Sequence, residues 1–313
     1  MSPIILPTEP RPAVRQEITD YNFCIMGDPG IGKSRLLASI PNYLLIDPIF
    51  GMKGMPGLVV NLQSWADHLE LPEKLGRMPK GAYAGIGLDM LNISYDLCSA
   101  HICRLLKISH PSELAHGTGW TRVTTEFTKW LQNMTLLGYH LVATCHTTIT
   151  EVTVGSRQYS RWIPAFVGGS AQSAYANTLK LFDIKGFMCM DTIMTPPTKK
   201  TVTKEGGVKA TVDTRVDVSD LLVSEARVIH FAPSNSWLAG DTSQMLPKKV
   251  ILTDDWREDW ALIKEAWGTG EGAHQMADQD IETGGQQVQA AEVGPSQLSV
   301  ATEPKGTSQR AVR

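Results

Sequence analysis

The chain has 313 residues, of which 42% are hydrophobic, and a formal net charge of −3. This length suits two domains or one large α/β domain with insertions, and the charge by itself does not indicate a nucleic-acid partner. No apolar run reaches the roughly 18 residues of a membrane span, and the first residues lack the pattern of a signal peptide, so we expect no membrane association.

The number and spacing of the cysteines indicate whether the chain is in an oxidising or a reducing compartment. The five cysteines include no Cys-x-x-Cys pair, and their number is odd. This pattern is typical of reduced thiols, and it does not supply the four well-spaced ligands that zinc needs. We therefore expect a cytoplasmic protein without a zinc site.

The first predicted elements surround a glycine-rich motif. Residues 1–20 are rich in proline and are predicted to form an extended arm. Residues 21–26 predict a buried strand and residues 35–40 the opening of a helix. Between them lies the sequence Gly27-Asp28-Pro29-Gly30-Ile31-Gly32-Lys33-Ser34, which fits the P-loop pattern G-x-x-x-x-G-K-[ST].

A strand, a glycine-rich turn and a helix in this order aim backbone N–H groups and the positive helix end at a phosphate. In such a loop the lysine reaches the β- and γ-phosphates, and the Ser hydroxyl binds Mg²⁺. We therefore predict that residues 27–34 bind ATP, with Lys33 on the phosphates and Ser34 on Mg²⁺. A chance match in a turn is the alternative, and the flanking strand and helix disfavour it.

Strand and helix signals continue to alternate along the chain. We predict strands over residues 43–47, 83–88 and 140–144, and helices over residues 63–75, 91–106 and 121–137. This alternation predicts a mainly parallel sheet flanked by helices, an α/β fold whose ligand lies at the carboxyl ends of the strands. Gly27, Asp47, Asp89 and His146 all follow strand ends and are expected at that edge.

Three of these residues are candidates for chemistry on the phosphates. Asp89 follows its strand directly, as does the acid that holds Mg²⁺ in P-loop enzymes; a solvated loop acid is the alternative. Asp47 is a weaker candidate for orienting water or metal. His146 either senses the γ-phosphate and signals to the following loop, or has a structural role. We assign catalysis to Lys33, Asp89 and His146, and the metal to Ser34 and Asp89.

The segment after His146 has a different composition. Residues 147–170, predicted as a loop, contain Arg157, Tyr159, Arg161 and Trp162, and residues 147–215 hold nine Lys and Arg against five Asp and Glu. Arginine suits contacts to phosphates, and aromatic rings suit stacking on bases of a single strand. We expect single-stranded DNA to bind here. An ordinary charged surface loop is the alternative.

The last part of the chain is predicted to extend the sheet and then to lose structure. Residues 178–190, 200–212 and 226–231 predict antiparallel strands. Residues 251–267 form a predicted acidic amphipathic helix whose apolar stripe packs on the core or docks a partner. Residues 268–313 have almost no aromatic residues and are predicted to be disordered.

The order of these motifs over residues 21–246 resembles phage-encoded RecA-like P-loop ATPases of the AAA type, which are small recombinase or single-strand-annealing proteins. The resemblance is carried by the P-loop, Leu44-Leu45-Ile46-Asp47 with Gly51, Trp65, Gly87-Leu88-Asp89, Leu141-Val142-Ala143-Thr144-Cys145-His146 and Ser234-Asn235-Ser236-Trp237-Leu238-Ala239-Gly240-Asp241. It implies a RecA-like ATP-binding domain over residues 21–250, binding to single-stranded DNA, and a location in the host cytoplasm if a phage encodes the chain.

The resemblance also implies assembly side by side, with the nucleotide between subunits. A basic residue of one subunit would then reach the nucleotide of its neighbour. The sequence leaves four candidates open for this role: Arg215, Arg227, Lys248 and Lys249.

One position departs from the family pattern. Relatives usually carry a glutamate that orients the attacking water two residues after the acid of the second strand, and here that position is Ile49. Either Asp47, Glu126 or another acid replaces it, or hydrolysis is slow or absent. Two functions follow: a DNA-dependent ATPase in phage recombination, annealing or replication, or a nucleotide-binding switch or scaffold without turnover. A small-molecule kinase is a third, but no arginine-bearing lid is evident.

Overall fold

The structure, a computed structural model, describes residues 16–166, 174–195 and 222–270, all within one compact unit, Met1–Gln275. Most of the expected arm over residues 1–20, the strand expected over 200–212, Arg215 and the tail beyond residue 270 lie outside the described residues. No helix in the described ranges is long and apolar enough to cross a membrane.

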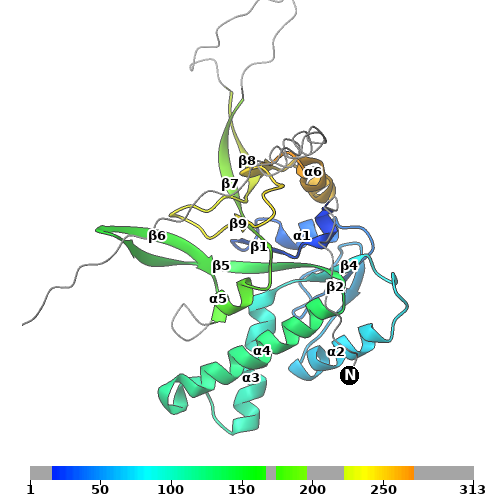
Figure 1. The fold of residues 1–313 in the computed structure, drawn as a ribbon, viewed down its shortest axis with the longest axis vertical. Helices are drawn as coiled ribbons and strands as arrows, with labels where there is room; N and C mark the ends of the chain where they lie inside the picture. Colours follow the sequence, from blue (N-terminus) through cyan, green and yellow to red (C-terminus); the bar gives the residue numbers. More distant parts are fainter. Residues whose placement is uncertain (1–15, 167–173, 196–221, 271–313) are drawn as a thin grey trace, which may run out of the picture. The chain divides into compact units, whose positions relative to one another are not determined.

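The described strands form one sheet in the order β10-β8-β7-β1-β5-β4-β2-β3, with β6 paired to β5 and β9 to β7 (Figure 1). The strands are β1 (Phe23–Gly27), β2 (Tyr43–Ile46), β3 (Leu58–Val60), β4 (Gly85–Leu88), β5 (His140–Val154), β6 (Arg157–Pro164), β7 (Ile184–Thr195), β8 (Leu222–His230), β9 (Gly240–Asp241) and β10 (Lys249–Ile251). Strands β7 to β3 in this order pair in parallel, whereas β8, β9 and β10 pair antiparallel. The predicted α/β P-loop NTPase fold is confirmed.

Helices cover both faces of the sheet. They are α1 (Lys33–Ala38), α2 (Trp65–Gly76), α3 (Leu91–Leu106), α4 (Thr118–Leu136), α5 (Ala174–Leu179) and α6 (Asp259–Ala266). One buried core joins the sheet to α2, α3 and α4 and contains Trp65 and Phe127. A second core, on the face of α1 and α6, contains Leu37 and Trp260 (Figure 1). The apolar stripe predicted over residues 251–267 therefore packs on the core. The predicted bounds of this helix are wrong at its start, because Ile251 ends β10 and α6 begins only at Asp259, after a 3-10 turn at Trp256–Glu258.

Strand β5 runs ten residues past its predicted end. Residues 147–154 continue β5, turn at Gly155, and pair antiparallel with β6 from Thr147↔Pro164 to Val154↔Arg157. The loop predicted over 147–170 is therefore wrong for residues 147–164, which we call the β5–β6 hairpin. The β-branched residues Thr147, Thr148 and Ile149 favour this extended backbone.

Two smaller predictions also change. The segment predicted as a strand from residue 178 begins within α5, where the Thr178 hydroxyl donates to the Ala174 carbonyl (2.9 Å), and strand β7 starts at Ile184. The short strand β3 was not predicted, because its residues are exposed and give no clear alternation.

Two glycines that made β4 look weak in the sequence are required by its neighbours. A Cβ atom on Gly85 would lie 2.6 Å from the His140 carbonyl oxygen, and one on Gly87 would lie 2.6 Å from a methyl group of Leu45. Strand β4 can therefore lie between β2 and β5 only without side chains at these positions. This close approach positions Asp89, the next polar residue, at the carboxyl edge.

Candidate nucleotide site

The P-loop connects β1 to α1 through two glycines with left-handed backbone. Gly30 and Gly32 have φ angles of 83° and 108°, which residues with a Cβ atom rarely adopt. Gly32 is the last residue before α1, whose first two residues are Lys33 and Ser34. The turn thus places the lysine and the serine side by side at the carboxyl end of β1.

Lys33 is 4% exposed and is held by three acceptors. Its Nζ donates to the carbonyl oxygens of Gly27 (2.9 Å) and Asp28 (2.7 Å), and it contacts Nδ1 of His146 at 3.2 Å. Burial lowers the pKa of Lys33 to about 8, against the opposing effect of carboxylates including Asp89. Because an ammonium group only donates, Nδ1 of His146 accepts and its ring proton is on Nε2.

Asp89 lies opposite the start of α1 and is 3% exposed. Its Oδ1 accepts from the Thr144 hydroxyl at 2.5 Å, and its carboxylate also hydrogen-bonds the Ser34 side chain. Burial raises the pKa of Asp89, and these two hydrogen bonds oppose that rise. A serine hydroxyl beside a carboxylate is the oxygen donor set that Mg²⁺ binds in P-loop proteins, so Ser34 and Asp89 fit the ion.

His146 lies within β5 and not at its end, which corrects the sequence-based placement. It pairs in register with Gly27, and its backbone N–H donates to Oδ1 of Asn92 at 3.2 Å. Burial, and then the nearby Lys33 ammonium, lower the pKa of His146, so the ring is neutral at neutral pH. The predicted trio of Lys33, Asp89 and His146 is therefore brought together.

Three residues missed in the sequence complete this network. Thr144 holds Asp89, Asn92 holds the backbone of His146, and the Thr147 hydroxyl donates to Oδ1 of Asp28 at 2.9 Å. Thr144 gave a usable signal, since it is a polar residue in an otherwise apolar strand. Thr147 gave none, because its P-loop partner is 119 residues away in the sequence.

Neither acid suggested as a substitute for the missing glutamate has a free carboxylate beside the P-loop. The carboxylate of Asp47 accepts the backbone N–H groups of Ile49 (3.2 Å), Gly51 (3.0 Å) and Met52 (2.8 Å), and so holds the turn after β2. Glu126 lines a hollow of about 330 Å³ between α2 and α4. Ile49 itself is 50% exposed.

A comparison with protein-family models matches residues 19–243 to an AAA domain. The chain belongs to the AAA domain family. No curated protein matches the chain, so the family match alone carries this assignment. It confirms an AAA-type P-loop ATPase domain, for which nucleotide binding, usually with Mg²⁺, is the expected property. The matched range includes the P-loop, Asp89, His146 and the β5–β6 hairpin.

The β5–β6 hairpin of this AAA domain carries three of the four predicted DNA contacts on one face. Residues two apart in a strand share a face, so Arg157, Tyr159 and Arg161 point the same way. Trp162 points the other way, where its ring centroid lies 6.1 Å from that of Phe187. Its backbone N–H donates to the Ser236 carbonyl at 2.8 Å. Trp162 therefore anchors the base of the hairpin.

Arg227 packs against the P-loop of its own chain. A Cβ atom on Gly32 would lie 3.0 Å from Nη1 of Arg227, so the guanidinium is packed against the P-loop. The sequence indicated Arg227 only as one of four residues that could reach a neighbour's nucleotide. No sequence motif identifies Arg227, because β8 and the P-loop are far apart in the sequence and come together only in the folded protein.

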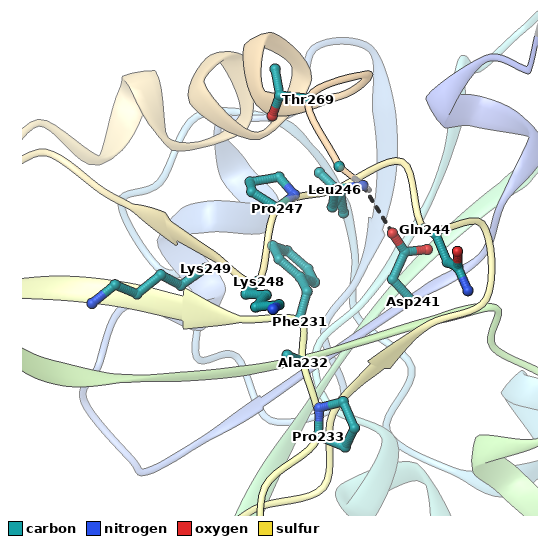
Figure 2. A pocket seen from close by; sticks show the side chains of 11 residues that line it. Phe231, Ala232, Pro233, Asp241, Gln244, Leu246, Pro247, Lys248, Lys249 and Thr269 are labelled. Atoms are coloured by element: carbon teal, nitrogen blue, oxygen red, sulfur yellow. Dashed lines mark hydrogen bonds between the residues drawn. The ribbon is translucent and has the colours of Figure 1, made fainter. Parts of the chain in front are cut away.

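A hollow of about 610 Å³ elsewhere in the described structure is not the P-loop site. Figure 2 shows its lining, which includes Phe231, Lys248 and Thr269, with the Asp241 carboxylate accepting the N–H of Leu246 (2.9 Å). Asp241 pairs with Ile184, and Ile184 pairs with Phe23, the first residue of β1. The hollow thus lies toward the amino end of β1, whereas the P-loop follows its carboxyl end.

Proposed function

We propose that this AAA domain binds ATP·Mg²⁺ through Gly27–Ser34 and Asp89, and acts as a DNA-dependent ATPase in phage DNA recombination, annealing or replication. One observation carries the proposal. The P-loop lysine shares its ammonium group with His146, and the strand that holds His146 continues directly into the β5–β6 hairpin.

On the nucleotide side, a bound triphosphate competes with the present acceptors of Lys33. The ammonium group donates to two backbone carbonyls and contacts His146, and phosphate oxygens are stronger acceptors for it. Ser34 and Asp89 would hold Mg²⁺, and the ion would neutralise charge on the phosphates. Asn92 and Thr144 keep His146 and Asp89 in place during this exchange.

On the DNA side, the β5–β6 hairpin offers two arginines and a tyrosine along one face. Arg161 is oriented by a hydrogen bond from its Nε to the Asn235 carbonyl (2.9 Å), which leaves its remaining N–H groups for phosphates. Tyr159 between the arginines supplies a ring on which a base stacks. This spacing supports single-stranded DNA as the partner, without sequence readout.

The two sides are joined at the start of the hairpin. His146 contacts Lys33, and the next residue, Thr147, is hydrogen-bonded to Asp28 of the P-loop. A phosphate that draws Lys33 away from His146 therefore changes the contacts of two consecutive residues at the hairpin base. We infer that nucleotide state reaches the DNA-binding face by this route.

The alternative function, a nucleotide-binding switch or scaffold without significant turnover, is favoured by one observation. Ile49 occupies the position of the water-orienting glutamate, and Asp47 is engaged by the turn amides. A P-loop that binds ATP without a group to orient water still changes shape on binding, but it releases little phosphate.

Steady-state ATP hydrolysis, measured with and without single-stranded DNA, separates these functions. A DNA-stimulated rate that Lys33→Ala abolishes supports the ATPase. Intact ATP binding with no stimulated hydrolysis supports the switch. Phosphate release without any added acceptor counts against a small-molecule kinase.

We further propose that copies assemble in the cytoplasm with nucleotide between neighbours. The exposed apolar side chains Ile49 and Phe50, in the turn after β2, support an interface close to the nucleotide edge. Sedimentation with and without ATP tests assembly: a larger species that requires ATP supports it, and a monomer under both conditions contradicts it.

A further inference from the structure

The inference concerns a buried ion pair packed behind the P-loop. Arg227 on β8 and Asp259, the first residue of α6, form a two-point contact, from Nη1 to Oδ2 at 2.8 Å and from Nη2 to Oδ1 at 2.9 Å. Asp259 is fully buried, and the Arg227 side chain is 17% exposed. Such a forked arrangement fixes the plane of the guanidinium as well as its position.

The guanidinium is held from a third direction and faces the P-loop. Its Nη2 also donates to the Thr253 carbonyl, so three of its five N–H groups are used in anchoring it. The Nη1 atom lies 3.0 Å from the place a Cβ of Gly32 would occupy, and Cδ lies 3.9 Å from it. Gly32 is the left-handed residue that directs the chain into Lys33.

The ion pair also connects the P-loop helix to the C-terminal helix. Helix α6 packs against α1, and the backbone N–H of Trp260 donates to the Ser39 hydroxyl at 3.2 Å. Arg227 thus touches the first turn of the P-loop helix, while its partner Asp259 begins a helix that is bound to the other end of α1. Movement of Gly32 would have to displace a guanidinium that α6 holds in place.

We propose that Arg227, anchored by Asp259, is a positioning residue for the triphosphate: it keeps the Gly32 turn in its left-handed conformation and adds a permanent positive charge behind the P-loop. This inference rests on the proposed nucleotide binding and extends it to a residue of the same subunit. It also makes α6, which lies beyond the matched family range, a requirement for phosphate affinity.

The test compares Arg227→Met with Arg257→Met, a control in an exposed arginine near the start of α6 that contacts Asp255 and Trp256. Dissociation constants are measured for ATP·Mg²⁺ and for inorganic tripolyphosphate, at a temperature where each variant gives a native circular-dichroism spectrum. We expect Arg227→Met to weaken both ligands about tenfold or more, and Arg257→Met to leave both within about twofold of the unsubstituted protein. Loss of both ligands together identifies the phosphates as the affected part.

A purely structural role predicts a lower melting temperature with unchanged constants, and this result for folded Arg227→Met overturns the proposal. So does a loss confined to ATP, since that effect would lie at the base or ribose. If Arg227→Met does not fold, the double variant Arg227→Met/Asp259→Leu is measured in its place, because removing both partners leaves no unpaired buried charge. Unchanged dissociation constants in the folded double variant again overturn the proposal. If that variant is also unfolded, Arg227→Lys is measured. Lysine cannot form the two-point contact with Asp259, so we expect both ligands to bind more weakly, and unchanged dissociation constants overturn the proposal.

Failure of the proposed nucleotide binding can be distinguished from failure of the role of Arg227. The unsubstituted protein is measured in the same assay, with Lys33→Ala as the variant expected to lose binding. If the unsubstituted protein binds neither ligand, the proposed nucleotide function is wrong. If it binds both and Arg227→Met binds them equally well, only the role of Arg227 is wrong.

Discussion

The P-loop edge and the β5–β6 hairpin are adjacent along β5, but they are built in opposite ways. At the P-loop edge, Lys33 and Asp89 are almost fully buried. Lys33 is held by two P-loop carbonyls and by the distant His146, and Asp89 by Thr144 and Ser34. On the hairpin, Arg157 and Tyr159 both lie in the exposed first half of β6, where that strand pairs with the far end of β5. A buried, preorganised site responds sharply to the loss of one group, whereas an exposed face responds in graded, salt-dependent steps.

The largest effect is expected from Lys33→Ala. Removal of the ammonium group should weaken ATP·Mg²⁺ binding at least about 100-fold, because the proposed site uses this charge as the direct contact to the β- and γ-phosphates. Isothermal titration calorimetry measures the change, with Lys53→Ala as a control in an exposed lysine that contacts the Phe50 ring. ATP affinity that survives Lys33→Ala would remove the P-loop from the proposal.

Asp89→Asn should have the next largest effect, and one that depends on Mg²⁺. The amide keeps the shape of the carboxylate but loses its charge, so Mg²⁺-dependent ATP affinity should drop about 10- to 100-fold while binding without Mg²⁺ changes little. The matched control is Asp47→Asn, which should lower the melting temperature by loosening three turn hydrogen bonds. Equal Mg²⁺ dependence in both variants would show that Asp89 is not the metal residue.

On the hairpin, the two faces should differ. Arg157→Gln and Arg161→Gln should each weaken single-stranded DNA binding about 3- to 10-fold and reduce the slope of log K against log salt by about 0.7, one phosphate contact. Gln158→Ala and Ser160→Ala, on the opposite face, should change neither quantity. Fluorescence anisotropy of a labelled oligonucleotide measures both, and equal losses from the two faces would contradict a one-sided contact.

The pH dependence of ATP affinity tests whether Lys33 is buried as the structure shows. Burial lowers the pKa of Lys33 to about 8, although Asp89 and Asp28 act in the opposite direction, so the free lysine is neutral above that pH. ATP affinity should therefore decrease as pH rises through about 8, by several-fold at pH 9, because binding must then take up a proton. Affinity that stays constant from pH 7 to 9.5 would contradict a buried, pKa-shifted lysine.

The lowered pKa of Lys33 also predicts that the free energy of unfolding rises with pH, whereas ATP affinity falls. Between pH 8 and the ordinary pKa of 10.5, the unfolded chain binds more protons at Lys33 than the folded protein. The free energy of unfolding should therefore gain a favourable contribution from this residue as pH rises through that window. Lys33→Met should abolish this contribution in urea unfolding measured at each pH.

The smallest effect is expected where the two regions meet. Thr147→Val removes the hydroxyl that donates to Asp28 and should cost about 1 kcal/mol of stability. ATP binding and DNA binding measured separately should change less than twofold, while the DNA stimulation of hydrolysis should decrease about 2- to 5-fold. Thr147→Ser keeps the hydroxyl and should preserve stimulation. Unchanged stimulation in Thr147→Val would place the coupling elsewhere.

The P-loop, the alternation of strands and helices, and the position of Asp89 after β4 could be predicted because each depends on a few consecutive residues. A strand followed by glycines, Lys33 and Ser34 has one local structure, and the helix predicted over residues 91–106 agrees with α3 at both ends. Periodicity also placed the apolar stripe of α6. These features are local in the chain, so the sequence by itself determined the fold class and the place of the P-loop in it.

Only the tertiary structure decided which distant residues complete that site. Arg227 reaches Gly32 because β8 pairs with β7 and β7 with β1, and Thr147 reaches Asp28 because β5 does not end at His146. Pairing with β5 also makes residues 157–164 a strand and not a loop. Trp162 and Arg161 therefore point to opposite faces, as neighbours along a strand do. Sheet register brings together residues more than a hundred positions apart, and no spacing within a motif contains that information.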